Sequence, residues 1–148
     1  MIKSTAIAIS ALLFASSVYA NCEGKDKVLF ACATEKGKQI EVCNFGQTVR
    51  YSYGRPNTKP EIVVIVPIEK VAGISWHASG RYITNAVIIP NLNAFYEVSW
   101  SADKLQESDE LEGGVEVFIN GKSKIISCQS APSVGNTDGI HFEEASGQ

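Results

Sequence analysis

The stretch VEVFINGKSKIISC, residues 115–128, decides the fold class of this chain. Apolar and polar residues alternate on both sides of Asn120-Gly121, the dipeptide that most favours a tight turn between two antiparallel strands. The alternation has the two-residue period of a strand with one buried face. The stretch therefore predicts a β-hairpin built from residues 115–119 and 124–128.

The same pattern recurs through the rest of the chain, with turn residues about every ten positions, which is typical of an all-β fold. Residues 61–67 are apolar on both faces, as expected for a central strand. Residues 101–109 are the one segment that favours a short helix, with Ser101 as its N-cap. The prediction is a single antiparallel β-barrel or sandwich of about eight strands. Their predicted ranges are 27–33, 38–44, 48–53, 61–67, 81–89, 94–100, 115–119 and 124–128.

Residues 1–20 have the features of a secretion signal. Lys3 provides the positive charge, residues 6–15 form an apolar run, and Val18-Tyr19-Ala20 offers the small residues that a signal peptidase recognises. The run is shorter than the roughly 20 residues that a transmembrane helix needs. We therefore expect cleavage after Ala20 and an exported protein, periplasmic or secreted, that is not anchored in the membrane.

The exported part is expected to form one domain, residues 21–128, followed by a disordered tail, residues 129–148. The tail is rich in Ser, Gly, Pro and acidic residues and has few apolar anchors. Without Lys3, the 13 basic side chains become 12 against 16 acidic ones, a net charge of −4. This charge argues against a nucleic-acid partner, because such binding depends largely on Lys and Arg at phosphates.

All four cysteines lie in the exported part, which predicts two disulfides in an oxidising compartment. A Cys32–Cys128 bridge would join the first and last predicted strands and leave Cys22 to pair with Cys43. Cys32–Cys43, across the first hairpin, is the alternative. A zinc site is disfavoured because no CxxC pair is present and the chain has only two histidines, so no metal or cofactor is expected.

We expect no enzymatic activity, because no catalytic constellation is visible. The cysteines are expected to be bridged, His77 falls in a loop, His141 falls in the tail, and no GxSxG motif is present. The carboxylates most able to act as an acid–base pair are crowded into one short acidic run, which is typical of a solvated loop. These residues are Glu107, Asp109, Glu110 and Glu112.

The most unusual segment is WHASGRY, residues 76–82. It combines Trp, Tyr and Arg, the residue types that dominate binding hot spots, with a glycine that allows a sharp turn. The other interpretation places Trp76 and Tyr82 in the core around an ordinary turn. The candidate partner-binding residues are His77, Ser79, Gly80, Arg81 and Tyr82.

Over residues 27–90 the chain resembles the bacterial periplasmic inhibitors of c-type lysozyme. The resemblance rests on Cys32, Gly37-Lys38, Ile40, Val49, Tyr51, residues 61–66 and Ala78-Ser79-Gly80-Arg81-Tyr82. It implies an eight-stranded antiparallel barrel whose Ser-Gly loop enters the lysozyme cleft. Ser79 would supply the contact hydroxyl, Tyr82 the supporting aromatic ring, and Arg81 a cation for an enzyme carboxylate. The chain lacks the family's Trp-Xaa-Lys-Gly stretch on the following strand.

The leading hypothesis is an inhibitor or immunity-type binding protein that plugs the cleft of a lysozyme-like cell-wall hydrolase without covalent chemistry. The alternative is a periplasmic β-barrel that binds a small molecule or an envelope component. In that case the aromatic residues Tyr51, Tyr53, Tyr96 and Trp100 would line a cavity. A third hypothesis is a hydrolase that uses the acidic run at residues 107–112.

Overall fold

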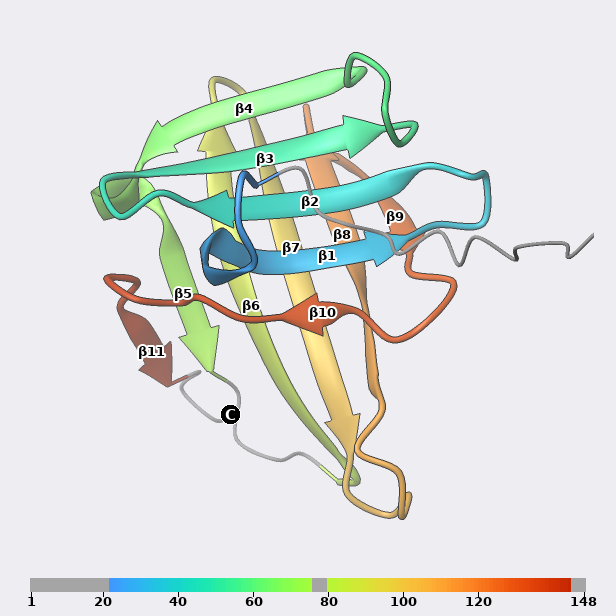
Figure 1. The fold of residues 1–148 in the computed structure, drawn as a ribbon. Helices are drawn as coiled ribbons and strands as arrows, with labels where there is room; N and C mark the ends of the chain where they lie inside the picture. Colours follow the sequence, from blue (N-terminus) through green and yellow to red (C-terminus); the bar gives the residue numbers. More distant parts are fainter. Residues whose placement is uncertain (1–21, 76–79, 145–148) are drawn as a thin grey trace, which may run out of the picture.

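The computed structural model of the chain describes residues 22–75 and 80–144. Two β-sheets form most of this part (Figure 1). The first sheet has five strands in the order β10-β1-β2-β3-β4, and the second has six in the order β11-β5-β6-β7-β8-β9. Each order has two free ends, so the fold is a sandwich and not a closed barrel.

The strands of the first sheet are β1 (Val28–Ala33), β2 (Gln39–Asn44), β3 (Thr48–Gly54), β4 (Ile62–Pro67) and β10 (Ser133–Val134). Those of the second sheet are β5 (Ala72–Ser75), β6 (Tyr82–Asn91), β7 (Ala94–Asp103), β8 (Leu111–Ile119), β9 (Lys122–Ser127) and β11 (Phe142–Glu144). Two short 3-10 helices, η1 (Lys25–Lys27) and η2 (Ile68–Lys70), precede β1 and follow β4. No helix within residues 22–75 and 80–144 is long and apolar enough to cross a membrane.

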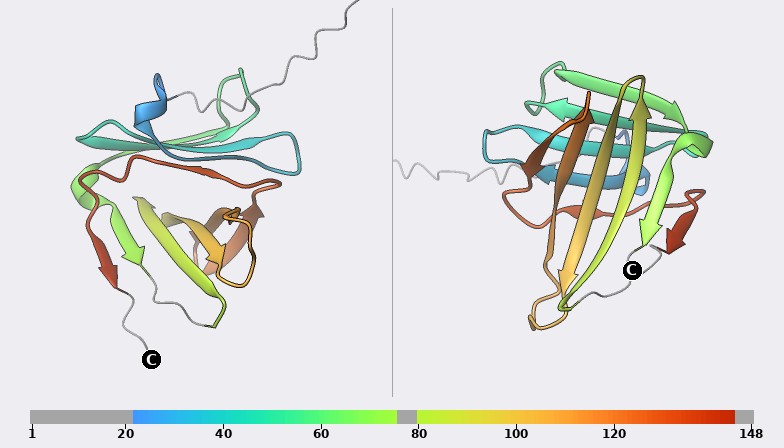
Figure 2. Two further views of the ribbon diagram at one scale, coloured as in Figure 1. Left: turned by 60° about the horizontal axis from the view of Figure 1, so that its bottom comes forward. Right: turned by 180° about the vertical axis from the view of Figure 1, so that it is seen from behind.

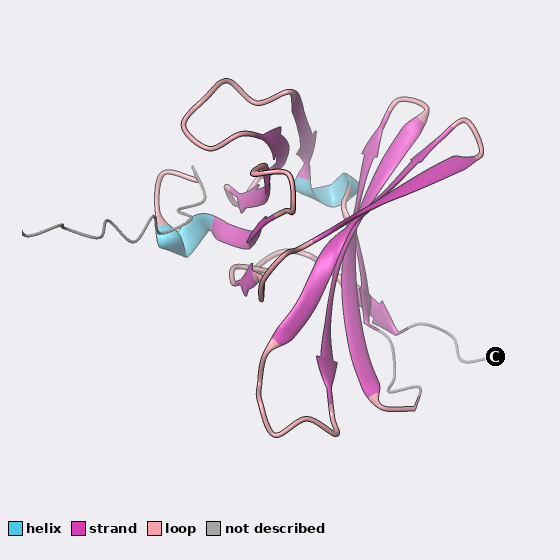
Figure 3. Ribbon diagram, turned by 90° about the vertical axis from the view of Figure 1, so that its right-hand side faces the viewer, coloured by secondary structure: helices cyan, strands magenta, loops and turns pink. Residues whose placement is uncertain are grey.

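The core lies between the two sheets, whose strands cross in Figure 1. The alternation along each strand directs one set of side chains into this layer. The larger members are Leu29, Phe30, Ile40, Val42, Val49, Tyr51 and Val64 from the first sheet and Val87, Ile89, Tyr96, Val98, Trp100 and Val115 from the second. Figure 3 shows the long strands of the second sheet extending past the first sheet at one end.

All eight predicted strands are present, and the structure adds β5, β10 and β11. Two local predictions are wrong. Residues 61–67 do not form a central strand, because β4 is the last strand of its sheet. The segment 101–109 is not a helix: Ser101–Asp103 continue β7, where they pair with β6 and β8, and a turn follows.

The prediction of a disordered tail is wrong for residues 129–144. β10 pairs with β1 through Phe30 and Val134, and β11 runs parallel to β5 through Gly73 and Phe142. Between the two strands, Ile140 is 8% exposed and belongs to the core. Figure 2 shows this segment passing from the first sheet to the second. A few well-spaced apolar anchors are thus enough to place a segment whose composition is otherwise polar.

The structure confirms the two predicted disulfides, and the alternative Cys32–Cys43 pairing is wrong. Cys22 bonds to Cys43, with Cα atoms 5.3 Å apart, and ties the segment before η1 to β2. Cys32 bonds to Cys128, with Cα atoms 5.7 Å apart. Because Cys32 lies in β1 and Cys128 directly follows β9, the second bridge joins the two sheets covalently.

Candidate partner-binding site

The predicted binding segment leads into one end of the β6–β7 ladder. The ladder begins at the turn where Asn91 pairs with Ala94 and ends where Tyr82 pairs with Asp103. This end lies at the bottom of Figure 1, beyond the first sheet. We call residues 80–83 together with residues 103–110 the tip.

Gly80 is the first residue of the tip that the structure describes. Its φ is +66°, in the left-handed region that glycine adopts at little cost. A β-carbon at this position would meet no other atom within 4 Å, so the backbone faces open space. The predicted contact residues His77 and Ser79 lie outside the described residues, as do Trp76 and Ala78.

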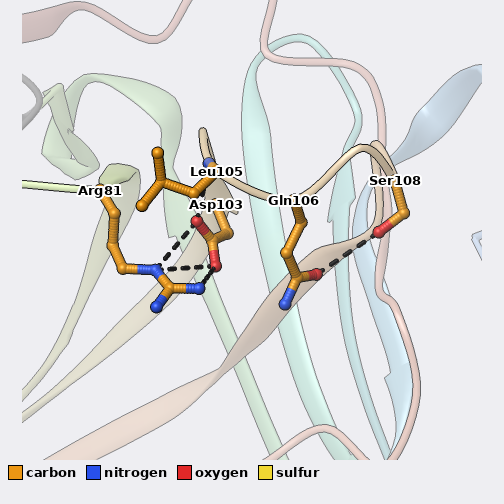
Figure 4. A network of polar contacts seen from close by, with 5 residues as sticks. All are labelled: Arg81, Asp103, Leu105, Gln106 and Ser108. Carbon is orange, nitrogen blue, oxygen red and sulfur yellow. Dashed lines mark hydrogen bonds and ion pairs between the residues drawn. The ribbon is translucent and has the colours of Figure 1, made fainter.

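An ion pair between Arg81 and Asp103 holds the base of the tip (Figure 4). The Arg81 Nε–H donates to Asp103 Oδ1 at 3.1 Å and to Oδ2 at 3.0 Å, and a terminal guanidinium nitrogen also bonds to Oδ2. Two backbone bonds complete the arrangement: the Leu105 N–H donates to Asp103 Oδ1 at 3.0 Å, and the Lys104 N–H donates to the Arg81 carbonyl at 2.7 Å. We call this set of bonds the clamp.

The clamp changes the role expected for Arg81. The resemblance to lysozyme inhibitors implies a cation available for an enzyme carboxylate, whereas here the guanidinium is bonded to Asp103 of the same chain. The Arg81 side chain is 47% exposed and that of Asp103 only 5%. Arg81 is therefore a positioning residue, which fixes the start of β6 against the turn that follows β7.

In the clamp, each of the two charged side chains stabilises the charged form of the other. The hydrogen bond from Arg81 holds the pKa of the Asp103 carboxyl below its usual value, and the bond from the Leu105 amide acts in the same direction. The same contact with Asp103 raises the pKa of Arg81. Both groups therefore remain charged at neutral pH, and the clamp is intact there.

Three apolar side chains are exposed around the clamp. Tyr82 is 38% exposed, Ile83 40% and Leu105 74%, so Tyr82 is not a core residue. The guanidinium carbon of Arg81 lies 5.4 Å from the centre of the Tyr82 ring, a cation–π distance. The clamp thus also orients an aromatic ring at the surface.

The acidic run belongs to the tip and its immediate continuation. Glu107, Asp109 and Glu110 lie in the exposed turn between β7 and β8, and Glu112 is exposed in β8. The turn is held at its start by the Gln106 N–H, which donates to the Asp103 carbonyl at 3.2 Å. Four exposed carboxylates in this short stretch give the tip a negative potential, which attracts basic surfaces.

The four aromatic residues predicted to line a ligand cavity do not surround one. Tyr51 and Tyr96 are buried, and their ring centroids are 4.5 Å apart. Trp100 packs against Phe30, with centroids at 6.2 Å. Tyr53 lines a groove of about 220 Å³ between the first hairpin and β9, together with Thr34, Glu35, Lys36, Lys124, Ile125, Ile126 and Ser127.

One group of side chains has the spacing of a metal site. Potential ligand atoms of Cys22, Glu41 and Cys43 lie within 4.8 Å of one another. The two sulfur atoms are joined in a disulfide, so neither can act as the thiolate that binds zinc. The group is therefore a structural feature.

Sequence reasoning does not single out Asp103 or Leu105, because the pattern of residues 101–109 favours a short helix. The signal that could have found them is the register of the ladder. The turn at Leu92-Asn93 makes residues whose numbers sum to 185 face one another, which places Asp103 opposite Tyr82 and beside Arg81.

Comparisons with protein-family models, with curated proteins and with solved structures find no match to this chain. The geometry of the tip is consequently the basis for a functional hypothesis.

Proposed function

We propose that this chain is an exported binding protein that inhibits a lysozyme-like cell-wall hydrolase by placing its tip in the active-site cleft of the enzyme. The clamp is the observation that carries the proposal. It holds Gly80 and Tyr82 at the far end of a ten-residue ladder, where the backbone of Gly80 faces open space and the ring of Tyr82 is partly exposed.

A rigid tip is what a cleft-filling inhibitor needs. Loops that must be ordered on binding lose part of the interaction free energy to conformational entropy, and a preformed loop avoids that loss. Here the ion pair and the bond from the Lys104 N–H to the Arg81 carbonyl order the base of the tip before any partner arrives. In the proposed complex Tyr82 contacts the wall of the cleft and Ser79 supplies a polar contact inside it.

The charge of the tip indicates the kind of hydrolase. The exposed carboxylates of the acidic run would speed association with an enzyme whose cleft has a basic rim, and raised salt would slow it. The mechanism is steric, so it requires neither a cofactor nor a covalent step.

The proposal is tested by measuring peptidoglycan turnover by a c-type lysozyme and a panel of other muramidases, with and without the mature chain, residues 21–148. We expect inhibition of at least one enzyme and a clear loss of inhibition in Tyr82→Ala. Phe95→Ala is the matched control, because Phe95 is also 38% exposed but lies at the opposite end of the β6–β7 ladder. The absence of inhibition and of measurable binding across the panel would refute the proposal.

The groove beside Tyr53 favours the second candidate, binding of a small envelope component. At about 220 Å³ it is smaller than the 300–1,000 Å³ of common ligand pockets, so we place it behind the inhibitor hypothesis. Native mass spectrometry of protein purified from a periplasmic extract tests it: a bound molecule that is lost in Tyr53→Ala would favour this candidate.

A further inference from the structure

β4 is an edge strand with an unusually apolar surface. It is the last strand of the first sheet, and it contains no charged residue from Ile62 to Pro67. Val63 is 49% exposed and Ile65 is 62% exposed. Soluble proteins normally protect such an edge with charges, prolines, bulges or short length, because its free backbone groups can pair with another chain.

The other edges of the two sheets have this protection. β10 has two residues, and β11 has three, including Glu143 and Glu144. β9 is longer but carries Lys122 and Lys124. β4, with six residues, is the one edge in residues 22–75 and 80–144 that is both long and uncharged.

The hydrogen-bond pattern shows which backbone groups of β4 face outward. Directly after β4, the Ile68 N–H donates to the Gln47 carbonyl at 2.9 Å. Alternate residues of an antiparallel pair bond to the neighbouring strand, so Val66 and Val64 use their groups on β3. The N–H and C=O groups of Val63 and Ile65 therefore point away from β3, where no other described strand pairs with them.

We propose that β4 pairs antiparallel with β4 of a second copy of this chain, about a two-fold axis at Val64. The two five-stranded sheets then become one continuous sheet. Val63 lies opposite Ile65 of the second copy, and Ile65 lies opposite its Val63. These two pairs use every outward-facing backbone group named above, and their side chains cover one another on the outer face of the sheet.

The neighbouring registers are less favourable, which makes this pairing specific. An axis at Ile65 would place Pro67, which has no N–H, opposite Val63. An axis at Val63 would pair Ile65 with Glu61, whose N–H already donates to the Tyr53 carbonyl at 2.9 Å.

The residue pattern of the strand favours a second copy as the occupant. In the register centred on Val64, Val63 faces Ile65 and Ile62 faces Val66 of the other copy, so apolar side chains meet at each of these positions. The two-fold axis generates each pair twice, whereas an unrelated strand would need matching apolar residues at the same positions.

One strand from each copy forms a small interface, below the roughly 800 Å² per partner of a standard protein complex. The dimer is therefore expected to dissociate on dilution. Sedimentation velocity of the mature chain, from low micromolar to submillimolar concentration, should show the weight-average mass rising from one chain towards two. A wild-type protein that stays monomeric throughout this range would overturn the proposal.

Two variants test whether β4 is the edge strand that forms the dimer interface. Ile65→Lys gives β4 the protection that β9 has and should weaken association at least about tenfold, or by about 1.4 kcal/mol. Ile125→Lys is the matched control, because Ile125 is 67% exposed on the edge strand of the other sheet and should leave the dimer unchanged. If Ile125→Lys dissociates the dimer and Ile65→Lys does not, β4 is not the interface.

Ile65→Pro separates strand pairing from simple apolar contact. The substitution removes only an outward-facing N–H and keeps the surface apolar, so the β3–β4 ladder stays intact. It should weaken the dimer if the two strands share backbone hydrogen bonds. A dimer of wild-type affinity in this variant would contradict the pairing, provided that near-UV circular dichroism shows an intact fold.

Discussion

β4 and the tip lie at opposite ends of the described structure in Figure 1, and they expose apolar side chains in different ways. β4 presents Val63 and Ile65 on a regular strand whose outward backbone groups have no described neighbour. The tip presents Tyr82 and Leu105 around the ion pair between Arg81 and Asp103.

The two regions should therefore respond differently to solution conditions. Contacts made by β4 depend on backbone hydrogen bonds and apolar burial, which salt and pH affect little near neutrality. Contacts proposed for the tip would depend on the clamp and on exposed carboxylates, whose interactions both salt and acid weaken. Salt and pH should therefore distinguish the two surfaces.

Removal of the bridge between the sheets should have the largest effect, because it uncouples the sheet of β4 from the sheet of the tip. The loop-entropy model assigns about 4.7 kcal/mol to Cys32–Cys128, which spans 96 residues, and about 3.4 kcal/mol to Cys22–Cys43, which spans 21. Urea unfolding of Cys32→Ala/Cys128→Ala and Cys22→Ala/Cys43→Ala measures both. Equal losses would contradict the model.

The second prediction concerns the buried hydroxyl of Tyr51 in β3, the strand next to β4. Tyr51 packs opposite Val64, its hydroxyl has no hydrogen-bond partner among the described residues, and burial raises its pKa. Tyr51→Phe removes a polar atom that folding leaves unsatisfied and should raise the free energy of unfolding by about 1 kcal/mol. Thermal and urea unfolding check this, and Tyr53→Phe, at a half-buried site, should have little effect.

A like-charge pair in the sheet of the tip should have a smaller effect. Glu97 lies directly opposite Glu116, and burial followed by this neighbour raises the pKa of Glu97. Protonated Glu97 therefore contributes to the free energy of unfolding at low pH. This contribution is lost as the pH rises through the raised pKa of Glu97. Glu116→Lys should add about 0.5 kcal/mol at neutral pH and less at pH values below about 4.

Urea unfolding at the two pH values measures this difference. Glu143→Lys is the control, because the exposed Glu143 faces Ile74 and no second carboxylate. A gain of equal size in both variants would show that the cross-strand pair is not the cause.

Loss of the clamp in acid should be confined to the tip and should change global stability least. The lowered pKa of Asp103 means that the clamp contributes at pH values above the ordinary aspartate pKa and is lost as the pH falls through the lowered one. The amide signals of Lys104 and Leu105 should therefore move only in strong acid, whereas Asp103→Asn should shift them at neutral pH. Movement of the β4 amides in the same titration would contradict a local effect.

The regular part of the fold could be predicted from the sequence because its determinants are local. The two-residue period and the Asn120-Gly121 turn identify the β8–β9 hairpin, and the structure confirms it. The disulfide pairing could also be predicted from the sequence, since Cys32 lies in the first long strand and Cys128 directly follows the last one.

The sequence could not show where each strand lies in its sheet. A strand that is apolar on both faces is typical of the middle of a sheet, but β4 is an edge strand on which Val63 and Ile65 are exposed. β11 was missed because its short polar segment is held by long-range pairing with β5. Asp103 was missed because its importance comes from Arg81, 22 residues away across a ladder.

The last described residues complete both layers: Cys128 closes the inter-sheet bridge, β10 extends the first sheet, and β11 extends the second. A newly made chain therefore cannot complete either sheet before its C-terminal portion has emerged from the ribosome. The last steps of folding are consequently expected to follow the end of synthesis, because the strands and the disulfide that join the two sheets come from residues 128–144.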